Sequence, residues 1–100
     1  MVQLSSSELE AALAELPGWR ALGDDAIGRE LTFPSFAIAI AFMTAVALFA
    51  ERTDHHPEWT NVYRSVSIRL TTHSEGGVTD RDIALARHVA ETAERLGATG

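Results

Sequence analysis

Residues 35–54, with the sequence SFAIAIAFMTAVALFAERTD, decide the fold, because the rest of the chain must be arranged around this apolar segment. Its first large residues alternate with alanine, which is a strand period, but alanine is the best helix former and the run is too long for a typical strand. Ser35 is a suitable N-cap, and Pro57 disfavours a helical conformation of His56 just before it. We therefore predict a helix from Ser35 to about Asp54.

This helix is apolar on more than one side. The 15 residues 36–50 are apolar except for Thr44, whereas a bilayer span needs about 20, so a buried helix is expected. Two stripes lie nearly opposite each other, one of Phe36, Ile40 and Met43, the other of Ile38, Phe42 and Phe49. A single layer of helices on a sheet covers only one stripe. We therefore expect a homodimer or homotetramer, with the helix from Ser35 to Asp54 in an interchain contact.

The flanking segments supply further helices and strands. Capping boxes start a first helix after Ser5 and a last helix after Thr79, and Gly97 closes the last one. Period-two alternation and turn residues predict strands over residues 19–22, 26–33, 59–64 and 66–73. The order α-β-β-α-β-β-α predicts one α+β domain over residues 1–100, a four-stranded antiparallel sheet with three helices packed on one face.

Composition narrows the chemistry open to these 100 residues. The formal net charge is −6, all eight basic residues are arginine, and there is no cysteine. This excludes a Schiff-base lysine, a thiolate nucleophile and cysteine-ligated metal. An acidic, lysine-free surface matches neither nucleic acid nor an anionic membrane, so we expect neither as a partner. The first residues lack the basic and apolar segments of a secretion signal, so a cytoplasmic location is expected.

Three of the four histidines lie where predicted elements end. His55 and His56 follow the helix, and His73 ends the fourth predicted strand. Glu51 and His55 are four residues apart and can share one helix face, so the carboxylate can orient the imidazole. Imidazole titrates near neutral pH, and the flat face of Trp59 suits a planar ring. These residues predict a histidine-based acid–base site beside an aromatic side chain, without a cofactor.

Plainer interpretations of the histidines stay open at this point. Adjacent histidines in a polar loop are often only solvated, and His73 could be an edge-strand residue without a task. His55 and His56 are neighbours that point differently, and no HxH or HExxH spacing occurs, so we expect no metal site. His88 falls with Arg81 on the polar side of the last helix, which predicts a solvated side chain. A Ser-His-Asp hydrolase is not expected either, because the chain has no nucleophile elbow.

The arrangement of these residues resembles the pterin-4a-carbinolamine dehydratase family. The matching residues are Glu51, the run Asp54-His55-His56-Pro57-Glu58-Trp59, then Asn61-Val62-Tyr63, Thr72-His73 and Asp82. The resemblance covers nearly the whole chain and implies the same α-β-β-α-β-β-α order. Thr60, where an aromatic residue would not be surprising, can alter the rim of the pocket.

The resemblance implies dehydration of 4a-hydroxytetrahydrobiopterin to quinonoid dihydropterin, in tetrahydrobiopterin recycling, with no cofactor and no metal. The catalytic set that it implies is His55, His56 and His73. The substrate-binding set that it implies is Glu51, Asp54, Trp59, Thr71, Thr72 and Ser74. The resemblance implies that Asp82 supports the site. A purely structural role, as the capping-box partner of Thr79, accounts for an aspartate at this position equally well.

The same family implies an alternative of another class. Some members act as protein-binding modules, either as a dimerisation cofactor of a homeodomain transcription factor or as rubisco assembly factors. A pure binding protein has no need of three positioned histidines beside an acidic residue. The complete set in this chain therefore favours the enzyme.

Overall fold

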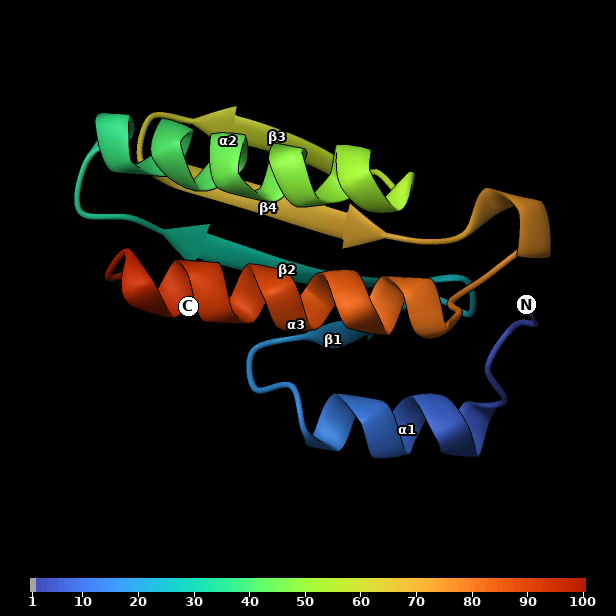
Figure 1. Cartoon of the computed structure of the whole chain (residues 1–100). Helices are drawn as coiled ribbons and strands as arrows, with labels where there is room; N and C mark the ends of the chain where they lie inside the picture. The colour runs from blue at the N-terminus through green and yellow to red at the C-terminus, as the bar shows by residue number, and fades with distance from the viewer. Residues whose placement is uncertain (1) are drawn as a thin grey trace.

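The computed structural model describes residues 2–100, and its elements follow the expected order (Figure 1). The helices are α1 Ser6–Ala14, α2 Phe36–Thr53 and α3 Asp80–Arg95; the strands are β1 Arg20–Leu22, β2 Ala26–Thr32, β3 Glu58–Val62 and β4 Ser65–Leu70; and a 3-10 helix, η1, spans His73–Glu75. The strands form one antiparallel sheet in the order β1-β2-β4-β3. The predicted α+β class and element order are confirmed.

One face of the sheet is covered by the helices. In the central pair of strands, Ile27 lies opposite Leu70 and Leu31 lies opposite Val66, and all four side chains are buried. α2 and α3 lie over this face, and α1 continues the helix layer beyond α3, beside β1 (Figure 1). The period-two alternation of these strands therefore places their apolar set on the covered side.

The last strand, β4, is shorter than predicted at its C-terminal end, next to His73. β4 ends at Leu70, so the prediction of a strand as far as His73 was wrong. An isolated bridge between Thr72 and Gly77 closes the following loop, and His73 opens η1 inside it. β4 ends where its neighbours run out, because Leu70 lies opposite Ile27 near the start of β2 and Arg69 lies opposite Glu58, the first residue of β3. Gly76, left-handed with φ 72°, then turns the chain back after η1.

α2 begins and ends where the sequence predicted. The Ser35 hydroxyl accepts a hydrogen bond from the amide of Ile38 at 3.1 Å. At the other end, Asp54 takes the left-handed conformation, with φ 53° and ψ 42°, so the helix stops at Thr53. The direction of the next residue, His55, is set by this turn and no longer by helical spacing.

The two apolar sides of α2 are not equally covered. The buried side consists of Ala39, Phe42, Val46 and Ala50. On the opposite side, Phe36, Ile40 and Leu48 are exposed by 49%, 40% and 66%. Of the predicted stripe, Phe36 and Ile40 are exposed whereas Met43 packs against the core, and Leu48, which belonged to neither predicted stripe, is more exposed than either.

α2 is the one helix within residues 2–100 that is long and apolar enough to cross a membrane by length and composition, with a mean hydropathy of 1.6. In the fold it lies along the sheet (Figure 1), and 22% of its residues are buried. Core helices of soluble proteins pass the same test. The expected buried helix is therefore buried along one side only.

The environment of the His88 side chain differs from the prediction. Its ring stacks on Phe49 of α2, with ring centroids 4.0 Å apart and planes 9° apart, so the prediction of a solvated side chain was wrong. Burial lowers the pKa of the His88 imidazole, while Glu91 raises it and Arg52 lowers it further. α2 and α3 pack side by side, and position 88 faces the neighbouring helix instead of solvent.

Candidate active site

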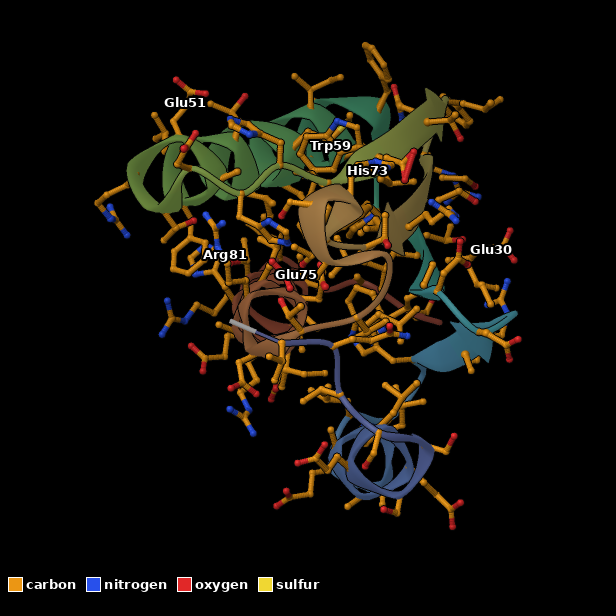
Figure 2. The ribbon with its side chains drawn as sticks, turned by 90° about the vertical axis from the view of Figure 1, so that its right-hand side faces the viewer. Glu30, Glu51, Trp59, His73, Glu75 and Arg81 are labelled. Carbon is orange, nitrogen blue, oxygen red and sulfur yellow. The ribbon has the colours of Figure 1, made fainter. Side chains whose placement is uncertain are left out.

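The candidate site residues lie at one end of the molecule. There the last turn of α2, the first residue of β3, the loop after β4 and the first turn of α3 meet (Figure 2). Glu51, Trp59, His73 and Arg81 all belong to this end. The rigid elements of the fold thus place loop residues from distant parts of the sequence near one another.

The centre of the site is a buried pair formed by His55 and Asp82. The Nε2 atom of His55 lies 2.6 Å from Oδ1 of Asp82, and the two residues are 8% and 0% exposed. The other carboxylate oxygen, Oδ2, accepts hydrogen bonds from the amide of Thr79 at 2.9 Å and from the hydroxyl of Thr72 at 2.8 Å. Three donors on two oxygens satisfy a buried carboxylate, which would otherwise be costly to bury.

The donor and the acceptor of each hydrogen bond around Asp82 can be assigned from the groups that take part. The amide of Arg81 donates to Oγ1 of Thr79 at 3.3 Å, and the two threonine hydroxyls lie 2.8 Å apart. Because Thr72 gives its proton to Asp82, Thr79 donates to Thr72. Asp82 is then an acceptor at both oxygens, so Nε2 of His55 carries the proton of that pair and Nδ1 is the nitrogen that can accept another.

The second histidine has a different carboxylate. Nε2 of His56 lies 2.6 Å from Oε1 of Glu51, and these side chains are 53% and 79% exposed. The prediction that Glu51 faces His55 was therefore wrong. Helical spacing ends at Asp54, and the backbone amide of His55 then donates to the carbonyl of Ala50 at 3.0 Å, which directs this histidine inward.

His73 approaches the site from the 3-10 helix and not from a strand. Its side chain is 80% exposed, and its Nε2 lies 3.8 Å from Oε1 of Glu58, the first residue of β3. Glu58 also binds Arg69, whose guanidinium lies 3.5 Å from Asp25. His73 is thus the outermost of the three histidines and has the weakest contact with a carboxylate.

The remaining predicted residues fall into three groups by their burial and hydrogen bonds. Trp59 lies opposite Ile68 in the sheet, so its ring is on the helix side, half-buried at the edge of the core. Asp54 and Ser74 are exposed. The hydroxyls of Thr71 and Thr72 are already used, by the carbonyl of Asp25 and by Asp82.

Two further residues of this site, Thr79 and Arg81, were not predicted from the sequence. Thr79 was identified only as a helix cap, although the capping box that it forms with Asp82 pointed to a contact between them. Nothing in the sequence signalled that the guanidinium of Arg81 reaches the carbonyls of Thr53 and Asp54. Within residues 2–100, no group of three histidine, aspartate or glutamate side chains is arranged to hold a metal ion.

The comparisons with known proteins identify the family of this chain. Residues 2–92 match the family model described as pterin 4 alpha carbinolamine dehydratase. A protein of Afipia carboxidovorans is 53% identical over 95 residues, covering 94% of this chain and 95% of that protein, and one of Nitrobacter winogradskyi is 52% identical over 99 residues, covering 97% and 98%. Both are provisionally named pterin-4-alpha-carbinolamine dehydratases.

Two solved structures share the fold. A crystal structure of a transcriptional coactivator/pterin dehydratase from Brucella melitensis has a TM-score of 0.89 and 47% identity, covering 91% of this chain and 98% of that one. A pterin dehydratase-like protein, identified as a RuBisCO assembly factor in the alpha-carboxysome, has a TM-score of 0.67 and 27% identity, covering 76% and 89%.

Proposed function

The chain belongs to the pterin-4-alpha-carbinolamine dehydratase family, and on this premise we propose that it dehydrates 4a-hydroxytetrahydrobiopterin to quinonoid dihydropterin in the cytoplasm, as a step of tetrahydrobiopterin recycling. The observation that carries the proposal is that two adjacent imidazoles each lie 2.6 Å from a carboxylate. One of these pairs is buried and the other exposed, so the two rings sit in different environments. A reaction that needs both an acid and a base can use such a difference.

The elimination requires two proton transfers and no other reagent. The C4a–O bond breaks as the hydroxyl gains a proton and leaves as water, and the N5 proton is lost as the C4a=N5 double bond forms. We assign the base to Nδ1 of His55, because the buried carboxylate of Asp82 stabilises the imidazolium that results. The leaving hydroxyl takes its proton from an exposed imidazole, His56 or His73.

The pterin would be held by the residues around these rings. The exposed carboxylates of Glu51 and Asp54 can accept hydrogen bonds from its N–H groups, and Trp59 offers an apolar surface to its rings. Ser74, in the loop after β4, is exposed and can offer its hydroxyl to the pterin as well. Thr71 and Thr72 act differently from the first expectation, because their hydroxyls are engaged within the protein and they support the site from behind.

We also propose that the chain forms a homodimer or homotetramer through α2. The exposed side of this helix carries Phe36, Ile40 and Leu48, each at least 40% exposed. Leaving apolar side chains of this size in water forfeits roughly 1.5–3 kcal/mol each relative to full burial. A total stability of about 5–15 kcal/mol makes that loss substantial, so a contact with a second copy is favoured.

A protein-binding module is the second candidate function. It is supported by the coactivator and assembly-factor descriptions of the two structural relatives and by the exposed apolar side of α2. The site itself supports the enzyme, because a binding surface has no use for a carboxylate and an imidazole buried against each other. The two functions can also coexist in one chain.

The test is a stopped-flow measurement of dehydration, with 4a-hydroxypterin generated chemically or enzymatically. The enzyme is expected to accelerate the reaction well beyond its spontaneous rate, in proportion to the protein concentration. A folded protein at micromolar concentration that leaves the spontaneous rate unchanged would refute the proposed activity and leave the binding module as the better account.

A further inference from the structure

We propose that Arg81 is a positioning residue for the reaction, which holds the end of α2 so that His55 and His56 leave the helix in their working orientation. Resting on the proposed function, this assigns a role to a side chain that touches no candidate catalytic group. One nitrogen of its guanidinium, Nη2, donates to the carbonyl of Thr53 at 2.8 Å and to the carbonyl of Asp54 at 2.6 Å. Figure 2 shows Arg81 at the same end of the molecule as the site.

The two carbonyls are those that a helix end leaves without partners. The last turn of a helix has four carbonyls with no intrahelical donor, and they form the negative end of the helix dipole. Asp54 is also a non-glycine residue in the left-handed conformation, which is uncommon and persists where the surroundings hold it. A cation that binds both carbonyls stabilises this turn, and the next two residues are His55 and His56.

A pocket beside this turn leaves it without close packing on that side. This pocket is open to solvent, has a volume of about 260 Å³, and is lined by Phe49, Thr53, His55, Asp80, Arg81 and Ala84. Side chains that line a cavity lack neighbours on that side, so they lose the contacts that fix a packed residue. The hydrogen bonds of Arg81 are therefore the direct tie between α3 and the backbone just before His55.

The first turn of α3 thus holds the same segment at two points. Arg81 binds the backbone of Asp54, and the next residue, Asp82, binds the ring of His55. The amide of Arg81 is itself fixed on the hydroxyl of Thr79. No carboxylate of residues 2–100 forms an ion pair with the Arg81 guanidinium, so its charge serves the helix end.

The test compares Arg81→Gln with Arg81→Lys and with Arg87→Gln. Arg87 lies on the same helix and is exposed, with no hydrogen bond or ion pair among the described residues, so its variant controls for the loss of one charge. Stopped-flow kinetics give kcat and KM, and hydrogen exchange follows the His55 amide, which donates to Ala50. Hydrogen exchange at the His55 amide reports on the hydrogen bonds of Arg81 whether or not the protein is active. A wild type without dehydratase activity would therefore refute the proposed function, and the exchange measurement would still test the role of Arg81.

Arg81→Gln is expected to lower kcat by about 10–100-fold, the scale of a small misplacement, with KM within about threefold. It should also speed exchange at the His55 amide, while Arg81→Lys recovers much of both and Arg87→Gln matches the wild type. Wild-type kcat and exchange in Arg81→Gln, a change in KM alone, or no recovery in Arg81→Lys would overturn the proposal. So would an Arg81→Gln protein that is unfolded even in the cold, because the role would then be structural.

Discussion

Asp82→Asn tests the assignment of the base with almost no change of shape. The amide and hydroxyl that donate to Oδ2, from Thr79 and Thr72, require an acceptor there, so the asparagine oxygen takes that position. Its NH₂ group then faces Nε2 of His55, where the carboxylate oxygen lay at 2.6 Å. Two N–H groups cannot face each other, so the ring must change to the tautomer protonated at Nδ1.

The expected loss follows from that tautomer. Nδ1 can no longer accept the N5 proton, so kcat should fall by about 10²–10⁴-fold, the usual contribution of a positioned acid or base. Replacing this charged, fully buried acceptor by a neutral amide weakens its hydrogen bonds and should also cost about 1–3 kcal/mol of folding stability. For a domain of this size, each kcal/mol corresponds to about 4–8 °C in Tm.

Three measurements decide the outcome. Stopped-flow kinetics give kcat, thermal unfolding followed by circular dichroism gives Tm, and ¹⁵N spectra of the imidazole show which nitrogen of His55 is protonated. Asp80→Asn is the control, since this neighbouring residue is exposed and undergoes the same change of charge. A folded Asp82→Asn protein whose kcat stays within about threefold of the wild type would refute the assignment of His55 as the base.

Turnover should survive incubation with EDTA and dialysis, since imidazoles alone carry the proposed elimination; a loss that a divalent cation restores would contradict this. His73→Ala should lower kcat by about 10²–10⁴-fold with little change in Tm, because the side chain is 80% exposed; an unchanged kcat would remove it from the site. Burial lowers the pKa of His88, so stability that is complete above the ordinary imidazole pKa of about 6.5 should fall as the pH drops through the lowered value. His88→Gln should remove part of that fall in urea titrations at about pH 7.5 and 5.5, and an identical pH dependence would contradict the burial of this ring. Leu48→Glu, at a position 66% exposed, should shift light scattering of the folded protein toward the 10.8 kDa monomer; a wild type that is already monomeric would contradict the proposed role of α2.

Local signals in the sequence were enough to locate the helices. Ser35 and Thr79 cap their helices through contacts three or two residues away, which depend little on the rest of the fold. The strands followed from alternation for the same reason, since Val66, Ile68 and Leu70 must share a face. The order of elements, and with it the α+β class, could therefore be predicted from neighbours in the chain.

The hydrogen-bond partners of the candidate site residues could not be predicted from the sequence. The hydrogen bond between His55 and Asp82 joins residues 27 positions apart, and no local pattern shows it. Helical spacing gave Glu51 the wrong partner, because one left-handed residue, Asp54, changes the direction of the two that follow. The prediction of a solvated His88 was wrong for a related reason. Its environment depends on the packing of α2 against α3, which are distant in the sequence.

The most direct test of the whole account is the rate of 4a-hydroxypterin dehydration by the wild type beside its His55→Ala and His56→Ala variants. The wild type is expected to accelerate the reaction, and each variant, shown to be folded by circular dichroism, is expected to lose about 10²–10⁴-fold of kcat. Folded variants that dehydrate the pterin as fast as the wild type would contradict the claim that this pair of histidines carries the chemistry.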